Sequence, residues 1–310
     1  MTIHKSVLLN EAIRGLNLKS GDIFFDGTLG GGGHSQKVCE LFSKSVKIVG
    51  VDKDSQAVRR AIEKFKTLDC DFNFQNASFR NIGEVLNNLN IKSVNGILLD
   101  LGLSSDQIEK SSRGFSFQKN EPLIMTFSAE GGDGITTAQT ILNEWSEETL
   151  ADILFGYADE RYARRIAKKI VEARQIKPIE KTFELVEIVK SAVPAGYKKG
   201  RIHFATKTFQ AIRMAVNDEI EALKEGLAAG YERLAEGGRM AIISFHSGED
   251  RLVKNFFKDK KAAGGGFAAT KKPITAGGEE LAENPRARSA KLRIFEKAGI
   301  KDETKNDKRD

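Results

Sequence analysis

The sequence contains little of what metal sites, disulfide frameworks and membrane spans require. Its 310 residues include two cysteines, Cys39 and Cys70, whose spacing matches no metal-binding motif. We expect both to be ordinary reduced thiols, as in a protein of the cytoplasm. No apolar run approaches the eighteen or so residues of a membrane-spanning helix, and the N-terminus lacks the apolar stretch of a signal peptide. These absences favour a cytoplasmic protein with no membrane partner.

Composition and charge indicate a soluble globular protein. Hydrophobic residues make up 40% of the chain and charged residues 30%, which is enough for a folded core. The net charge of +6 permits a nucleic-acid partner without requiring one. The length suits one domain with an insertion. We find no internal repeat and no cluster of His, Cys and carboxylates that requires a metal, and the sequence leaves the oligomeric state open, a homodimer included.

Strands and helices alternate over the first hundred residues. Stretches between the strands have helical spacing over 35–42 and 55–65, the second with Ser55 as N-cap. Such alternation predicts an α/β fold with a mostly parallel sheet. Four apolar runs predict its first strands: 22–25, 46–52, 71–79 and 94–102.

The pattern changes after Asp100. Residues 104–134 show little periodicity, and the helical patterns that follow have no strand between them. They predict helices over 146–157, 159–174, 182–193 and 206–235, then a strand over 239–245, a helix over 249–258 and a late strand over 291–297 that pairs near 269–274. We therefore divide the chain into a core (1–105), an inserted helical domain (106–205), the rest of the core (206–300) and a charged tail (301–310).

The segment "DGTLGGGGHS", residues 26–35, lies between the first strand and the first helix. In a parallel sheet this loop is at the carboxyl edge, where ligands bind, and glycines let a ligand approach the backbone. The dinucleotide pattern G-x-G-x-x-G fails at Ser35, which makes an NAD oxidoreductase a distant alternative, and His34 stands where a P-loop has lysine. An acidic residue followed by G-x-G, here from Gly30, is the arrangement used for S-adenosylmethionine.

Acidic residues also end the second and fourth strands. Asp52 can accept the ribose hydroxyls of that cofactor, Phe79 can cover its adenine, and Asp100 can face the reactive methyl group. Each residue also has an ordinary structural explanation: a helix cap for Asp52, core packing for Phe79 and a turn for Asp100. For Phe79 alone the structural explanation is the stronger one.

Six motifs in order resemble one family: "DGTLGGGGHS", "GILLDLGLSSDQI", "RGFSF", "ATKTFQAIRMAVNDEI", "ISFHSGEDR" and "NPRARSAKLR". The chain is similar from His4 to about Lys297 to the bacterial ribosomal RNA small-subunit methyltransferase H family. This resemblance implies methylation of N4 of a cytidine in 16S rRNA of the small ribosomal subunit, S-adenosylmethionine as cofactor, and a Rossmann-like domain interrupted by a helical domain that helps to bind RNA. It also implies cofactor contacts at Gly32, Gly33, His34, Asp52, Phe79, Asp100 and Gln107.

The sequence departs from the family pattern at several positions. Ser6 replaces a proline near the N-terminus, and Ile124 and Thr126 replace an acid and an arginine. The last two changes remove a possible ion pair next to the expected target pocket. They keep two alternatives open: a methyltransferase that acts on a different RNA base, and a non-catalytic RNA-binding assembly factor.

Chemistry at cytosine N4 suggests further site residues. The nitrogen lone pair is delocalised into the ring, so the site must accept hydrogen bonds from the amino group and take a proton. Asp100 is the candidate acceptor, with Ser104 and Ser105 shaping the pocket. His246, after the strand at 239–245, can contact RNA or handle protons, and a structural role for it is about as plausible.

Basic and aromatic stretches supply candidate RNA contacts. Arg113, Phe115 and Phe117 of "RGFSF" can stack on splayed bases. Arg164 and Lys168 lie in a helix whose apolar stripe faces inward, so that its charged side chains face solvent. Because such groups neutralise phosphates, RNA binding through them is expected to depend strongly on salt concentration. The remaining candidates are Asn217, Arg286 and Arg288.

Overall fold

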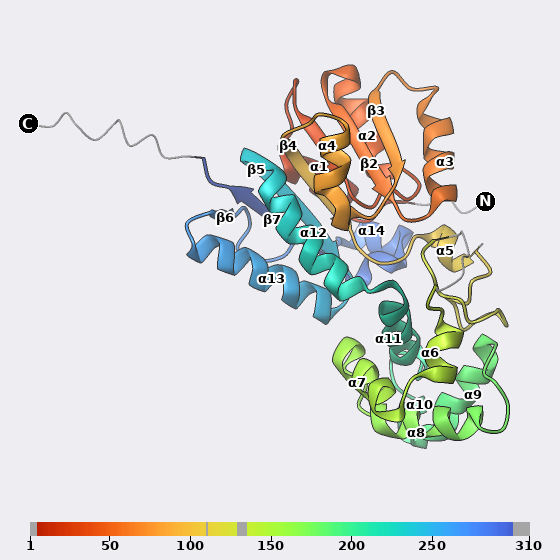
Figure 1. Cartoon of the computed structure of the whole chain (residues 1–310). Helices are drawn as coiled ribbons and strands as arrows, with labels where there is room; N and C mark the ends of the chain where they lie inside the picture. Colours follow the sequence, from red (N-terminus) through yellow and green to blue (C-terminus); the bar gives the residue numbers. More distant parts are fainter. Residues whose placement is uncertain (1–4, 110, 129–134, 300–310) are drawn as a thin grey trace, which may run out of the picture. The chain divides into compact units, whose positions relative to one another are not determined.

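The computed structural model describes residues 5–109, 111–128 and 135–299, apart from the side chains of Ser105 and Asp106. The predicted tail at 301–310 lies outside these residues. The chain forms two compact units: Met1–Gly102 with Ala222–Asp310, and Leu103–Glu221 (Figure 1). The second unit therefore extends past the predicted boundary at 205, because helix α11 (Thr206–Asn217) packs on α7 (Glu147–Ala158).

The first unit contains a mostly parallel sheet, which confirms the predicted α/β fold, and this sheet has seven strands. Its strand order is β3-β2-β1-β4-β5-β7-β6, in which β7 runs antiparallel to both β5 and β6. The chain moves outward from β1 to β3 and then returns to the other side of β1 with β4. The loops after β1 and β4 therefore lie side by side at a topological switch point. The strands are β1 (Ile23–Asp26), β2 (Lys47–Asp52), β3 (Asp71–Asn76), β4 (Val94–Asp100), β5 (Leu234–Ser244), β6 (Gly266–Ala268) and β7 (Lys291–Lys297).

Alternate residues of the strands enter two separate hydrophobic cores. Phe24 and Leu98 belong to the core with α1, α2 and α3, and their neighbours Phe25 and Leu99 belong to the core with α4, α12 and α13. Because both faces are covered, the central strands are apolar throughout, as is usual for parallel sheets. The helices of this unit are α1 (Leu9–Leu16), α2 (Gly33–Phe42), α3 (Ser55–Phe65), α4 (Ile82–Asn88), α12 (Glu219–Arg233), α13 (Ser247–Ala262) and α14 (Gly278–Glu283).

Helices and loops make up the described part of the second unit, around a core of its own. Ile166 and Ile170 of α8 are fully buried in this core, which confirms the apolar stripe predicted for that helix. The helices, besides α7 and α11, are α5 (Ser105–Glu109), α6 (Ala138–Glu144), α8 (Ala163–Arg174), α9 (Thr182–Ala192) and α10 (Ala195–Lys198).

Three local predictions were wrong. Asp54, not Ser55, caps α3, because its carboxylate accepts the N–H groups of Gln56 and Ala57. The predicted helix over 206–235 is broken at Asp218, which adopts a left-handed conformation (φ 51°) and separates α11 from α12. The fifth strand begins at Leu234 instead of 239 and contains an irregularity in its pairing with β4, which accommodates the two glycines of "EGG".

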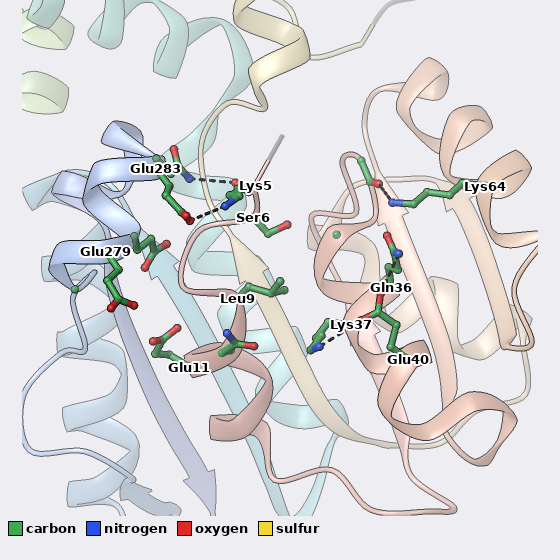
Figure 2. Close-up of a pocket in the computed structure, with 16 residues that line it drawn as sticks. Lys5, Ser6, Leu9, Glu11, Gln36, Lys37, Glu40, Lys64, Glu279 and Glu283 are labelled. Atoms are coloured by element: carbon green, nitrogen blue, oxygen red, sulfur yellow. Dashed lines mark hydrogen bonds and ion pairs between the residues drawn. The ribbon is translucent and has the colours of Figure 1, made fainter. Parts of the chain in front are cut away.

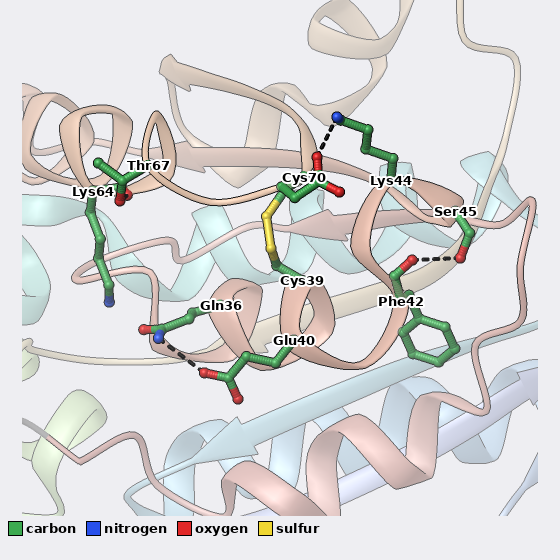
Figure 3. Close-up of a disulfide and its surroundings, with 10 residues drawn as sticks. Gln36, Cys39, Glu40, Phe42, Lys44, Ser45, Lys64, Thr67 and Cys70 are labelled. Atoms are coloured by element: carbon green, nitrogen blue, oxygen red, sulfur yellow. Dashed lines mark hydrogen bonds and ion pairs between the residues drawn. A yellow bond between two sulfur atoms is a disulfide. The ribbon is translucent and has the colours of Figure 1, made fainter.

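A disulfide joins Cys39 of α2 to Cys70, just before β3 (Figure 3). The two Cα atoms are 5.6 Å apart, an ordinary separation for such a bond. The expectation of two reduced thiols was therefore wrong. Spacing along the chain does not show that α2 and the start of β3 are neighbours, because the β2 strand and α3 lie between them in sequence.

No helix among the described residues is both long enough and apolar enough to cross a membrane.

Candidate functional site

The glycine loop follows β1 and leads into α2. Gly30 and Gly32 have positive φ angles of 49° and 69°, a conformation that side-chain-bearing residues rarely adopt. Space beside Gly31 is open, since a Cβ there would meet no atom within 4 Å. The loop therefore presents bare backbone at the carboxyl edge of the sheet.

Asp52 at the end of β2 holds this loop. Its Oδ2 accepts the Gly30 N–H over 2.8 Å, and its Oδ1 accepts the Asp54 N–H over 2.8 Å. Burial raises the pKa of Asp52, and these two hydrogen bonds act against that rise. Each carboxylate oxygen retains acceptor capacity, so the group can also receive the hydroxyls of a ribose.

Asp26 at the end of β1 is buried within the loop's base. Ser35 Oγ donates to its Oδ2 over 2.6 Å, and the Thr28 N–H donates to its Oδ1 over 3.2 Å. Burial raises the pKa of Asp26 to about 6. Asp26 therefore fixes the start of the loop to the first turn of α2.

Asp100 ends β4, the strand next to β1. Its backbone N–H donates to Thr28 Oγ1 over 2.7 Å, while its buried Oδ1 has no hydrogen-bond partner among the described residues. Burial and then the negative charges of Asp26, Glu249 and Glu280, in that order, together raise its pKa to about 8. A buried acceptor without a partner is uncommon in proteins and indicates a position for a ligand.

His34 lies beside Asp100. Its buried ring donates from Nε2 to the Val7 carbonyl oxygen over 3.1 Å, and its Nδ1 is 4.0 Å from Asp100 Oδ2. A carbonyl oxygen can only accept, so Nε2 carries the proton in the contact with Val7. Nδ1 is the ring atom that faces Asp100.

Phe79 begins the short turn η2 (Phe79–Asn81) after β3. Its ring packs against α12 at Gly226, where any Cβ would collide with the ring. The ring is part of the edge of the core, and it is also partly exposed. Its place after β3 agrees with both explanations offered above, core packing and a cover for adenine.

The N-terminal segment, residues 5–8, joins the loop to α14. Leu8 N–H donates to Glu280 Oε1 over 2.7 Å, and Lys5 pairs with Glu283 (Figure 2). A Cβ at Gly33 would collide with Ser6 Oγ, so the serine found in place of the family's proline packs directly on the loop. A cavity of about 790 Å³ lies here, between this segment, α2 and α14.

These residues fit S-adenosylmethionine. The open backbone at Gly31, the carboxylate of Asp52 and the partnerless Oδ1 of Asp100 offer contacts for a compact amino-acid end, a ribose and a cationic sulfonium. Gly31, Asp52 and Asp100 do not form the lysine-containing loop that binds phosphate groups. In the described part of the chain, no group of His, Cys, Asp and Glu residues is placed to hold a metal ion.

His246 follows β5, next to β4 in the sheet. It is the N-cap of α13, with Nδ1 accepting the Glu249 N–H over 3.4 Å, and its Nε2 is 3.2 Å from Glu249 Oε1. Glu249 also accepts the Phe245 N–H over 2.9 Å. The imidazole therefore has a structural role in the loop after β5.

Ser104 and Gln107 form hydrogen bonds with each other and so stabilise the loop that contains them both, in the second unit. The Ser104 N–H donates to Gln107 Oε1 over 2.9 Å, and the Gln107 N–H donates to Ser104 Oγ over 3.2 Å. Ser105 begins α5, and its side chain lies outside the described part of the structure. The predicted cofactor contact at Gln107 is thus a buried amide that shapes the chain just after Asp100.

Asn217 at the end of α11 holds the segment that carries two family departures. Its Nδ2 donates to the Met125 carbonyl over 2.7 Å, and its Oδ1 accepts the Phe127 N–H over 2.7 Å. Met125 has a positive φ of 58°, so this contact maintains an unusual backbone. Thr126 is buried, and its hydroxyl donates to the Ser128 carbonyl.

The "RGFSF" residues hold the loops of the second unit together. Arg113 Nη1 donates to the Thr126 and Phe127 carbonyls over 2.9 and 2.7 Å. Phe115 is buried in the core, so we assign it to packing and no longer to base stacking. Phe117 is partly exposed and stacks on His203 at 4.5 Å between ring centroids.

The basic candidates are exposed. Arg164 and Lys168 lie on the solvent face of α8, and Arg286 and Arg288 lie in the short helix η3 (Pro285–Ser289) of the first unit. Each unit therefore offers cations to a polyanion.

Sequence reasoning missed Thr28, Glu249 and Glu280 as neighbours of Asp100. Glu249 lies in the quoted motif "SFHSGEDR", which was a usable signal. Glu280 belongs to a short helix far along the chain, and no local pattern connects it with β4.

Comparisons with known proteins agree with this geometry. The profile of the MraW methylase family matches residues 1–298. A ribosomal RNA small subunit methyltransferase H of Persephonella marina is 44% identical over 294 residues, covering 95% of this chain and 99% of the relative. The proteins of that name from Acetivibrio thermocellus and Brevibacillus brevis are 43% and 39% identical, each covering 95% of this chain and 98% of the relative.

Among solved structures, an rRNA methylase from Streptococcus thermophilus is similar with a TM-score of 0.43 and 10% identity, covering 96% of this chain and 99% of that one. The family profile and the three relatives extend over nearly the whole chain, including the glycine loop, Asp52 and Asp100. The chain therefore belongs to the MraW methylase family.

Proposed function

We propose that this chain is an S-adenosylmethionine-dependent methyltransferase that modifies N4 of a cytidine in 16S rRNA of the small ribosomal subunit. The family and the names of the three relatives support this activity. The observation that carries it is Asp100, a carboxyl group at the switch point of the sheet. Its buried Oδ1 has no hydrogen-bond partner in the part of the chain that the structure describes. The group is available both to a cation and to an amino group.

The cofactor, when bound, supplies an electrophilic methyl group on a sulfonium that leaves readily. The protein therefore contributes mainly by positioning the two reactants. Asp52 and the Gly30 backbone hold the ribose side, and Asp100 accepts a hydrogen bond from the N4 amino group. As the N–C bond forms, the electrons of the S–C bond stay on sulfur, and Asp100 takes a proton from N4.

Residues that follow Asp100 in the chain complete the substrate side. Ser104 and Ser105 remain the candidates for contact with the target base, and Gln107 holds Ser104 through two hydrogen bonds. Asn217 positions Met125 and Phe127 instead of touching the base. We assign His246 a positioning role in place of proton handling or RNA contact, since it caps α13 and lies against Glu249.

Exposed cations bind the rRNA backbone. Arg164 and Lys168 on α8 contribute from the second unit, and Arg286 and Arg288 from the first. Phe117 is the ring of "RGFSF" left partly exposed for stacking. The small ribosomal subunit is a cytoplasmic substrate, so we place the protein in the cytoplasm.

Incubation with labelled S-adenosylmethionine and undermethylated small ribosomal subunits tests the proposal. We expect label in 16S rRNA and, after digestion, N4-methylated cytidine by nucleoside mass spectrometry. Label in a different nucleoside would establish a methyltransferase with another target. Cofactor binding without any transfer would favour an assembly factor.

A further inference from the structure

An excess of carboxyl groups surrounds Asp100. Asp26 at the end of β1, Glu249 in α13 and Glu280 in α14 each raise its pKa through their negative charge. The elements that carry them come from both ends of the chain and from both sides of the sheet. The sulfonium is thus proposed to lie beside a carboxyl group on which three other negative charges act.

Among the described residues, Asp100 itself has no lysine or arginine beside it to balance its charge. No Lys or Arg within that part of the chain forms an ion pair with Asp100, whose partner at 4.0 Å is the ring of His34. Asp26 accepts hydrogen bonds from Ser35 and Thr28, and Glu280 accepts one from the Leu8 N–H. These donors are neutral, whereas Glu249 has the His246 ring 3.2 Å from its Oε1.

The methyl donor and its product differ in charge at the reacting atom. The sulfonium of S-adenosylmethionine is a cation, and the thioether of S-adenosylhomocysteine is neutral. A cation entering the cluster favours the ionised form of a nearby carboxyl group, whereas a neutral thioether does not. The two ligands therefore have different effects on the protonation of Asp100.

We propose that Asp100 and its carboxyl neighbours select the donor over the product by charge, with Asp100 releasing its proton when the sulfonium binds. This inference rests on the proposed function, which puts the sulfonium beside Asp100. Binding then creates the carboxylate that the reaction needs. When the methyl group leaves sulfur for N4, the proton released from N4 returns to Asp100, and the neutral product lies next to a neutral acid.

The direction of the pH dependence follows from this scheme. In the free protein Asp100 is largely protonated below its pKa of about 8, with Asp26, Glu249, Glu280 and His34 facing it. Donor binding releases a proton in that range, so donor affinity rises as pH rises. The increase approaches about tenfold per pH unit below the pKa and levels off above it. Product affinity lacks this increase.

Isothermal titration calorimetry of the full chain measures the effect directly. Titrations with S-adenosylmethionine and with S-adenosylhomocysteine at pH 7.0, in buffers of different ionisation enthalpy, give the protons released per ligand bound. We expect a release approaching one proton for the donor and none for the product. At pH 9.5 the donor release falls toward zero, because Asp100 is already ionised.

Two variants and a matched control assign the proton. Asp100→Asn abolishes the release and reduces the ratio of donor to product affinity at least about tenfold, since a neutral amide cannot respond to the sulfonium. Glu280→Gln keeps an oxygen for the Leu8 N–H but removes one flanking charge, so the release shifts to lower pH. Glu279→Gln, on the same helix and not among the groups that raise the Asp100 pKa, leaves the release unchanged.

Equal proton release with both ligands, or full release in Asp100→Asn, would overturn this inference while leaving the proposed function intact. Binding of the donor with no release at pH 7.0 would do the same. Failure of the donor to bind at all would overturn the proposed function and this inference with it. A melting curve for each variant confirms that it is folded before the titration.

Discussion

Asp52 Oδ2 accepts the backbone N–H of Gly30 over 2.8 Å, which connects the end of β2 with the loop after β1. Gly30 has a positive φ, so this bond holds the loop in a conformation that a free chain adopts only part of the time. One carboxylate therefore shapes the loop and, through its remaining lone pairs, offers acceptors to a ribose.

Asp52→Ala should weaken binding of S-adenosylmethionine about 10- to 100-fold, because both the loop contact and the ribose acceptors disappear. Calorimetric titration measures the change. Asp54→Ala is the matched control: it removes the cap of α3 and lowers stability by about 1 kcal/mol, with little change in cofactor affinity. Equal loss of affinity in both variants would show that Asp52 acts only through local folding.

Asn217→Ala should lower the free energy of unfolding by about 1–3 kcal/mol, since it leaves the Met125 carbonyl and the Phe127 N–H without their partner. We expect methylation of ribosomal subunits to fall while cofactor affinity stays within about twofold, because the segment belongs to the second unit. Denaturant unfolding and calorimetry separate the two effects. A selective loss of cofactor affinity would contradict this assignment.

Asp100→Asn should stabilise the folded protein near neutral pH. The folded-state pKa of about 8 lies above the ordinary value of 3.8, so the folded state binds more protons than the unfolded state between these values. The contribution of Asp100 to stability therefore falls as pH rises from about 4 to about 8. We expect the variant to raise the Tm by at least about 2 °C at pH 8, with less change at pH 4. A lower Tm at pH 8 would contradict the pKa assignment.

Loss of the Cys39–Cys70 disulfide should destabilise the first unit by about 2–4 kcal/mol, because the bond closes a loop with a sequence separation of 31 residues. The double variant Cys39→Ser/Cys70→Ser should melt at the same temperature with and without reductant, unlike the parent chain. Thiol titration of the denatured, unreduced protein should find no free thiol. Two free thiols per chain would show that the bond is absent in solution.

Arg164→Ala with Lys168→Ala should weaken binding to 16S rRNA and make the plot of log affinity against log salt less steep, by up to about two units of slope. Filter binding over a range of salt concentrations measures this. Lys258→Ala, an exposed cation of α13 in the other unit, is the control. An unchanged slope in the double variant would remove α8 from the RNA interface.

The arrangement of the first unit could be predicted because apolar strands and the acids that end them are local signals. Asp26, Asp52 and Asp100 each end a strand in the structure, and the sequence alone places all three at one edge. The local predictions that were wrong depend on a choice between two similar residues, or on packing between segments that are far apart in the sequence. Asp54 and Ser55 are adjacent cap residues, and Asp218 breaks a helix whose apolar stripe continues on both sides.

The site was predicted only as far as its local motifs extend. Glycine loops and strand-end acids indicate a cofactor, but the partnerless oxygen of Asp100 and the charge of Glu280 beside it appear only after folding. The roles of Asn217 and Phe115 changed for the same reason. Asparagine and phenylalanine are residue types that can contact RNA. Both side chains are buried here, however, and support the neighbouring loops.

The hydrogen bonds of residues 5–8 have a consequence for synthesis of the protein. Val7 orients His34, and Leu8 binds Glu280, which lies 272 residues further along the chain, so residues 5–8 are synthesised long before the helix that holds them. A nascent chain that lacks α14 has no acceptor from that helix for the Leu8 N–H. A chain truncated before Gly278 therefore keeps its glycine loop but loses the contact that anchors residues 5–8 to α14.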